Sequence, residues 1–264
     1  MRPWTHGVCE TKDISIHYRR TGGTKPPVLL LHGLMGSGAC WTPLARALEG
    51  EFDLVMPDAR GHGASSGPLH GYQYEDFAGD VVGLIHGLGL SRPVLLGHSM
   101  GGMTAAVVAS RNPKILRGLI LVDPTFLSPE RQREVYESEV TEQHRQALGL
   151  QKSDLIAQAQ TRHPHRSPEI IEIQAEARLK TRLAAFEVLT PPNPAYREVV
   201  SAMEAPSLLV IGDSPVVTLD MAMELRRLNP RVQIEQIEKA GHGLPFEQPE
   251  RLAEVVLSFL RGLA

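Results

Sequence analysis

The sequence has few cysteines, little net charge and no long apolar run, so it lacks the features that mark disulfide-rich, nucleic-acid-binding and membrane proteins. Its 264 residues include only two cysteines, Cys9 and Cys40, which need not pair, so a reduced, cytoplasmic setting is expected. The formal net charge is −3, without a basic excess or a long run of like charge, which argues against nucleic acid as a partner. No apolar run is long enough to cross a bilayer, and the N-terminus has no apolar signal segment, so no membrane association is expected.

The residues that are present favour a soluble globular chain with a substantial core. Hydrophobic residues make up 42% of the chain and charged residues 22%, and the length suits one large α/β domain or two small ones. Short runs rich in Val, Leu and Ile predict strands at residues 14–20, 27–32, 53–58, 94–98, 118–123, 207–212 and 232–237. Helical patterns are found at residues 41–48, 74–88, 99–111, 219–228 and 249–263. Near-continuous apolar strands separated by helices indicate a mostly parallel sheet that is covered on both faces.

The alternation of strands and helices stops between residues 125 and 205. This segment is rich in Glu, Gln, Arg and Ala and contains no convincing strand, so it is expected to form several inserted helices. We therefore predict a core made of residues 1–124 and 206–264, with residues 125–205 as a helical lid over the carboxyl ends of the strands, where ligands bind in open α/β sheets. The alternative is a helical side domain that only adds stability.

A serine between glycines is the first candidate for chemistry. The stretch VLLGHSMGG places Ser99 where a predicted strand ends and a predicted helix begins. A nucleophile elbow needs such a sharp, strained turn, and Gly97, Gly101 and Gly102 leave room for it. The N-terminus of the following helix would also direct N–H groups and the positive end of its dipole toward a developing oxyanion.

Histidines are numerous, and one of them has the setting of a general base. His242 follows the last predicted strand, between glycines in KAGHGLPFEQPE, so its ring is expected to be exposed and aimed at a substrate. His98, next to the elbow serine, and His62, in the loop DARGHGASS, are interpreted as structural. His163 and His165 lie in the lid segment, but no Cys or carboxylate at metal-site spacing accompanies them, so no metal is expected.

The oxyanion hole of such a site needs two backbone donors. One is the N–H of Met100, the residue after the nucleophile, and the other is expected from Leu34 in the turn LLHGLMGSGACW. Gly33, Gly36 and Gly38 in the same turn raise the alternative of phosphate binding. Their spacing is the reverse of the dinucleotide fingerprint and no P-loop lysine follows, so nucleotide binding is not expected.

Taken together, these stretches resemble the signatures of the α/β-hydrolase superfamily. LLHGLMGSGACW, MPDARGHGASS, LLGHSMGG and KAGHGLPFEQPE occur in the order typical of that superfamily, and the likeness covers nearly the whole chain and is weakest in residues 125–205. The resemblance implies an α/β-hydrolase fold with a helical lid and Ser99 as the nucleophile. It implies His242 as general base and acid, and Leu34 with Met100 as oxyanion donors. No cofactor is required.

The acidic member of the triad is where the sequence departs from the superfamily. Most members carry an Asp in the loop after the strand that follows the lid, just before Pro-Val-Val. Here Ser214 stands in that place and Asp213 precedes it. Asp123, at the end of the strand predicted at residues 118–123, resembles the acid of a minority of the superfamily. We predict Asp123 as the triad acid, with Asp213 as the alternative.

These residues predict hydrolysis of a carboxylic ester, or of a lactone or thioester, through an acyl-enzyme on Ser99. The alternatives are C–C bond hydrolysis, cofactor-free perhydrolase or haloperoxidase-like chemistry, and a non-catalytic ligand receptor on the same fold. The expected partner is a small-molecule ester or lactone, and the sequence does not determine the oligomeric state. Trp41, Phe126 and Phe186 are candidates for lining the substrate pocket, although the sequence favours a place in the hydrophobic core for each of them.

Overall fold

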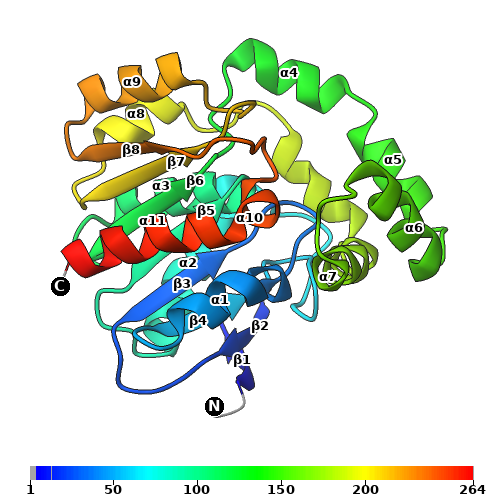
Figure 1. Cartoon of the computed structure of the whole chain (residues 1–264), viewed down its shortest axis with the longest axis horizontal. Coiled ribbons are helices and arrows are strands. Elements are labelled where there is room, and N and C mark those ends of the chain that lie inside the picture. The colour runs from blue at the N-terminus through cyan, green and yellow to red at the C-terminus, as the bar shows by residue number, and fades with distance from the viewer. Residues whose placement is uncertain (1–3, 13, 264) are drawn as a thin grey trace.

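The computed structural model describes residues 4–12 and 14–263, which form an eight-stranded sheet (Figure 1). The strand order is β1-β2-β4-β3-β5-β6-β7-β8, and the neighbouring pairs from β4 across to β8 are parallel. The strands β1 and β2 pair antiparallel and extend one edge. The strands are β1 (Thr5–Glu10), β2 (Ser15–Arg20), β3 (Pro27–Leu31), β4 (Asp53–Pro57), β5 (Val94–His98), β6 (Gly118–Val122), β7 (Ser207–Ile211) and β8 (Val232–Gln236).

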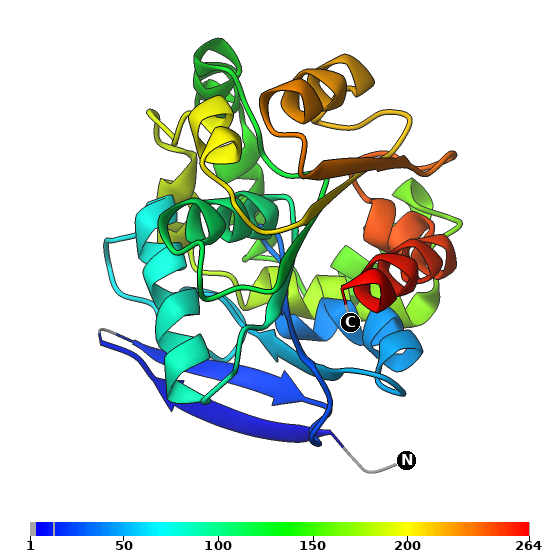
Figure 2. The same ribbon diagram turned by 90° about the vertical axis from the view of Figure 1, so that its left-hand side faces the viewer.

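Helices cover both faces of this sheet (Figure 2). Outside the insertion they are α1 (Thr42–Leu48), α2 (Tyr74–Gly87), α3 (Met100–Arg111), α9 (Leu219–Leu228), α10 (Leu244–Glu247) and α11 (Pro249–Gly262). Successive side chains of a strand point to opposite faces, so Val28 and Leu30 of β3 pack with α1 and α11, whereas Leu29 and Leu31 pack with α2 and α3. Apolar residues are therefore needed at every position of the central strands.

The segment between β6 and β7 is helical. It contains α4 (Pro129–Glu137), α5 (Val140–Ala147), α6 (Lys152–Arg162), α7 (Pro168–Leu179), the 3-10 helix η2 (Leu183–Leu189) and α8 (Tyr196–Ser201). The helices α4 to α7 lie together beyond one end of the strands (Figure 1). In contrast, α8 packs against α3, and Phe126, Tyr196 and Val200 belong to the large core cluster. Both ends of the segment predicted as a lid thus take part in the packing of the core.

The strands and helices predicted from the sequence are all present, and their ends differ from the prediction by no more than one residue. The strand β1 was not predicted, because Cys9 is its one buried side chain and no alternation can be seen in its sequence. The four-residue helix α10 is too short to show a helical period. In the part of the chain that the structure describes, no helix has the length and apolar composition that crossing a bilayer requires.

Candidate active site

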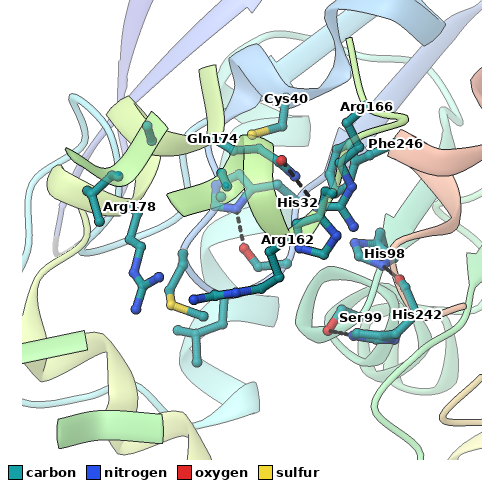
Figure 3. A pocket seen from close by; sticks show the side chains of 18 of the residues that line it. His32, Cys40, His98, Ser99, Arg162, Arg166, Gln174, Arg178, His242 and Phe246 are labelled. Carbon is teal, nitrogen blue, oxygen red and sulfur yellow. Dashed lines mark hydrogen bonds between the residues drawn. The ribbon is translucent and has the colours of Figure 1, made fainter. Parts of the chain in front are cut away.

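A cavity of about 380 Å³ lies at the carboxyl ends of the parallel strands (Figure 3). Its lining includes His98 and Ser99 at the end of β5, the turn that follows β3, and His242 in the loop that follows β8. Side chains of α6 and α7 complete the lining. Segments far apart in the sequence meet here because parallel strands bring all their carboxyl ends to the same edge of the sheet.

Ser99 occupies a sharp turn between β5 and α3. Its φ of 56° lies in the left-handed region, which a residue with a side chain adopts under constraint from its surroundings. A Cβ atom at Gly97 would overlap the carbonyl of Gly101, and one at Gly101 would overlap the carbonyl of Leu31. The two glycines therefore allow β3, β5 and α3 to approach closely enough to hold the serine in this conformation.

His242 lies between Ser99 and Asp123. Its Nε2 atom is 2.9 Å from Ser99 Oγ, and its Nδ1 atom is 2.6 Å from Asp123 Oδ2. With a proton on Nδ1 that is donated to the carboxylate, Nε2 accepts the serine proton, which is the tautomer that a general base needs. The Asp123 side chain is fully buried, whereas the His242 side chain is 42% exposed. The ring therefore connects a buried charge with the cavity.

Two backbone amides hold the carboxylate of Asp123. Val216 N–H donates to Oδ2 at 3.0 Å and Val217 N–H donates to Oδ1 at 2.9 Å. Both amides belong to the loop after β7, where the resemblance to the superfamily places the usual acid. Asp213 in this loop is exposed, and its carboxylate accepts a backbone N–H from the segment after β8. The structure brings Asp123 rather than Asp213 to the histidine ring, and the loop supplies amides where most of the superfamily supplies a carboxylate.

The two expected oxyanion donors have free backbone N–H groups. Within the described residues, the N–H groups of Leu34 and Met100 donate no hydrogen bond. His32 holds the turn of Leu34, because Ala59 N–H donates to its Nε2 at 3.0 Å and its Nδ1 proton is donated to the Gly33 carbonyl at 2.8 Å. Burial lowers the pKa of His32, which keeps the ring neutral and in the tautomer that these two hydrogen bonds require.

A second histidine and an ion pair hold the backbone around His242. His98 Nε2 donates to the His242 carbonyl at 2.7 Å, which agrees with a structural role for His98. Glu247 accepts the N–H of Gly241 at 2.8 Å and pairs with Arg166, whose Nη2 atom is 2.8 Å from Glu247 Oε1. Because Arg166 lies between α6 and α7, the ion pair connects the inserted helices to the loop of His242.

Two buried histidines make the fold sensitive to acid. Burial lowers the pKa of His62 and of His98 from 6.5 to about 3. Below pH 6.5 the unfolded chain binds protons that the folded chain does not, so the free energy of unfolding falls as the pH decreases from 6.5 toward 3. Each of the two histidines is expected to contribute a loss of roughly 1 kcal/mol per pH unit within this range.

The variant His62→Gln is expected to weaken this pH dependence. His62 is fully buried in the loop after β4, where its Nδ1 atom donates to the Arg60 carbonyl at 2.8 Å, and glutamine does not titrate. Urea unfolding at about pH 7, 6 and 5 should show that the variant loses about 1 kcal/mol less stability than the wild type between pH 6 and 5. A wild-type free energy of unfolding that stays constant over this interval would contradict the prediction.

Of the three aromatic residues predicted to line the pocket, Trp41 does so. Phe126 instead stacks on Tyr196 within the core, and Phe186 stacks on His144 among the inserted helices. Both phenylalanines are buried and lie outside the lining of the cavity, so as pocket candidates they are wrong and the hydrophobic core favoured by the sequence is their place. The reason is that a large aromatic ring buries more apolar area between packed elements than on the wall of an open cavity.

The sequence analysis did not single out the polar side chains that α6 and α7 present to the cavity. Gln158 and Arg162 of α6 share one face with Leu155 and Ala159, at the three- and four-residue spacing of a helix, and Arg178 of α7 lies in the same lining. The helical spacing was visible in the sequence. Because α6 carries polar residues on several faces, the spacing alone did not show which face is turned toward Ser99.

Comparison with known proteins shows the family of this chain. The sequence profile of the alpha/beta hydrolase fold matches residues 26–249. The chain belongs to this family. This α/β hydrolase is 30% identical to the sn-1-specific diacylglycerol lipase ABHD11 of Mus musculus over 257 residues. The alignment covers 90% of this chain and 81% of the lipase. It is 30% identical over 251 residues to the N-formylmaleamate deformylase of Pseudomonas putida, with 91% of each chain covered.

Solved structures share the architecture of this α/β hydrolase. The crystal structure of E-2-(acetamidomethylene)succinate hydrolase superposes with a TM-score of 0.84 at 23% identity and covers 98% of this chain and 100% of its own. The superfamily and the fold class predicted from the sequence are thereby confirmed. In this α/β hydrolase the ends of β5 and β6 and the loop after β8 supply Ser99, Asp123 and His242, whose roles are proposed below.

Proposed function

We propose that this α/β hydrolase cleaves a carboxylic ester, or the related lactone or thioester, through an acyl-enzyme on Ser99. The observation that carries the proposal is the unbroken chain of hydrogen bonds from Ser99 Oγ through His242 to Asp123. These hydrogen-bonded residues lie at a cavity of about 380 Å³, a volume that suits a small-molecule substrate.

Each residue of the site has a role in a two-step acyl transfer. His242 accepts the proton of Ser99 as Oγ attacks the carbonyl carbon, and Asp123 stabilises the imidazolium without taking up the proton. The N–H groups of Leu34 and Met100 donate to the oxyanion of the tetrahedral intermediate. His242 then protonates the leaving oxygen, and in the second step it activates the water that releases the acid.

An amide is the second candidate for the bond that is cleaved. The relative from Pseudomonas putida is named as a deformylase of an N-formyl compound, so a related chain is described as removing an acyl group from nitrogen. His242 is placed to protonate a departing nitrogen as readily as a departing oxygen. The ester remains the first candidate because an oxygen leaving group depends less on protonation, and because the mouse relative is named as a lipase.

The inserted helices α6 and α7 are proposed to act as a lid that shapes the substrate site. Both helices contribute side chains to the lining of the cavity, and the Arg166–Glu247 ion pair connects them to the loop of His242. Trp41 also lines this cavity and is proposed to contact the substrate. This assignment makes the lid narrower than residues 125–205, whose ends pack in the core.

A fluorophosphonate probe and a panel of 4-nitrophenyl acyl esters, lactones and formanilide test the proposed function. We expect one label per chain, located at Ser99 by mass spectrometry, and turnover of at least one ester without added peroxide. Labelling without any turnover would favour a ligand receptor on the same fold. Turnover that appeared only with hydrogen peroxide would favour the perhydrolase reaction. A protein that showed neither labelling nor turnover would contradict the proposal.

A further inference from the structure

The candidate substrate cavity carries an excess of positive charge. Arg162 from α6, Arg178 from α7 and Arg166 from the loop between them belong to its lining, and no Asp or Glu does so among the described residues. Arg166 is neutralised, because its Nη2 atom is 2.8 Å from Glu247 Oε1, and its Nη1 atom donates to Gln174 at 3.3 Å. The uncompensated positive charge of the cavity therefore comes from Arg162 and Arg178.

Neither Arg162 nor Arg178 has an acidic partner in the described chain. Arg178 donates from Nη2 to the Gln143 carbonyl at 3.2 Å, and its Nε atom is buried without a hydrogen-bond partner. Most other arginines of the inserted segment pair with a carboxylate, as Arg131 does with Glu134 at 2.6 Å, and Arg182 donates to the Gly67 carbonyl at 3.0 Å. Arg162 and Arg178 differ from these arginines because they lack a carboxylate partner and face the candidate active site.

The two guanidinium groups lie together on the same side of the cavity. The helix α6 packs against α7, and Figure 3 shows the side chains of Arg162 and Arg178 ending near each other. Burial and then the charge of Arg162 lower the pKa of Arg178, as expected for two cations that share a site without an anion. A bound anion would relieve this repulsion and use the donors that the protein leaves free.

We propose that Arg162 and Arg178 bind a carboxylate of the substrate, so that the enzyme selects esters or amides whose acyl or leaving group ends in a carboxylate. The inference rests on the proposed hydrolysis at Ser99. The planar guanidinium donates two parallel N–H groups to a carboxylate, a geometry that a neutral ester does not match. Two apolar side chains of α6, Leu155 and Ala159, line the cavity as well and suit the carbon chain between the two ends of the substrate.

Matched pairs of esters that differ only in charge test this proposal. The first pair is 4-nitrophenyl hydrogen adipate and its methyl ester, in which the carboxylate belongs to the acyl group. The second pair is 4-acetoxybenzoate and its methyl ester, in which the carboxylate belongs to the leaving group. We expect one anionic ester to exceed its neutral partner in kcat/KM by about 10- to 100-fold, mainly through a lower KM. The pair that shows the effect identifies the end of the substrate that carries the carboxylate.

Variants of the two arginines should remove this preference. Arg162→Gln and Arg178→Gln are each expected to lower kcat/KM for the anionic ester by about 10-fold or more, with the neutral ester nearly unaffected. Arg162→Glu should reverse the preference, and the fold is expected to persist because Arg162 is exposed. Arg131→Gln is the matched control, because this exposed arginine of α4 lies outside the cavity lining. Equal kcat/KM for charged and neutral esters would overturn the inference and leave the proposed hydrolysis standing.

A binding measurement separates the inference from catalysis. Adipate is expected to raise the Tm of the Ser99→Ala variant, and the additional change Arg162→Gln should abolish the rise. Adipamide, the neutral analogue, should have no effect. An equal rise with adipamide, or an arginine-dependent rise with inorganic phosphate and none with adipate, would overturn the carboxylate assignment. If every ester in the panel failed while adipate still bound through the arginines, the proposed hydrolysis alone would be wrong.

Discussion

Replacing Ser99 by alanine is expected to lower kcat on an ester by about 10⁶-fold and to abolish labelling by a fluorophosphonate. The attacking oxygen lies 2.9 Å from His242 Nε2, and alanine leaves the base without a proton to take. Binding in the cavity and the oxyanion donors remain, so a small acceleration over water should persist. The measurements are kcat on one 4-nitrophenyl ester and the mass of the chain after exposure to the probe.

The control for this variant is Ser110→Ala, which makes the same substitution in α3. The hydroxyl of Ser110 donates to the Val107 carbonyl at 3.0 Å and lies outside the cavity lining, so turnover and labelling should match the wild type. Both variants should keep the wild-type Tm to within a few degrees. Near-normal turnover by a folded Ser99→Ala protein would show that Ser99 is not the nucleophile.

The variant Asp123→Asn is expected to lower kcat by about 10⁴-fold. The carboxylate oxygen 2.6 Å from His242 Nδ1 accepts its proton and thereby keeps Nε2 free to act as the base. An amide that turns its NH₂ group toward the ring would favour the opposite tautomer. The single oxygen of the asparagine amide would then not accept both of the hydrogen bonds that the carboxylate accepts from the N–H groups of Val216 and Val217.

Asp213→Asn serves as the matched control for the acid. This carboxylate is exposed and accepts a backbone N–H, a contact that does not involve His242, so kcat should remain near that of the wild type. The comparison needs the same ester and a check by thermal unfolding that both proteins are folded. A collapse of kcat in Asp213→Asn with normal rates in Asp123→Asn would reverse the assignment of the acid.

Local patterns in the sequence were sufficient to predict the core and its likeness to the α/β-hydrolase superfamily. The central strands are buried on both faces, so they appear as continuous apolar runs. The helices between them show apolar residues at three- and four-residue spacing. The elbow at Ser99 is also local, because the glycines that allow it lie within three residues of the serine. Features of this kind depend on neighbours along the chain and are therefore visible in the sequence.

The sequence left two candidates for the triad acid and favoured Asp123 over Asp213. Both Asp123 and Asp213 follow strands that end at the same edge of the sheet, and a sequence contains no distance between a carboxylate and a histidine ring. In the structure the loop after β7 favours Asp123, because its amides at Val216 and Val217 hold this carboxylate against His242. Backbone contacts with the segment after β8 hold that loop, since Asp213 N–H donates to the Ala240 carbonyl and Lys239 N–H donates to the Asp213 carboxylate, and no local pattern in the sequence describes such contacts.

The sequence by itself determined the sheet and its helices, the sharp turn at Ser99, the loop position of His242 and the turn that carries Leu34. Tertiary structure alone decided which side chains of the inserted helices face the cavity. Phe126 and Phe186 pack away from it, whereas Arg162 and Arg178 enter its lining. The physical reason is that the rotation of a helix about its axis depends on the elements it packs against, and α6 has polar residues on more than one face. The charge of the cavity, and with it the proposed choice of substrate, therefore depends on the packing of α6 and α7 against each other.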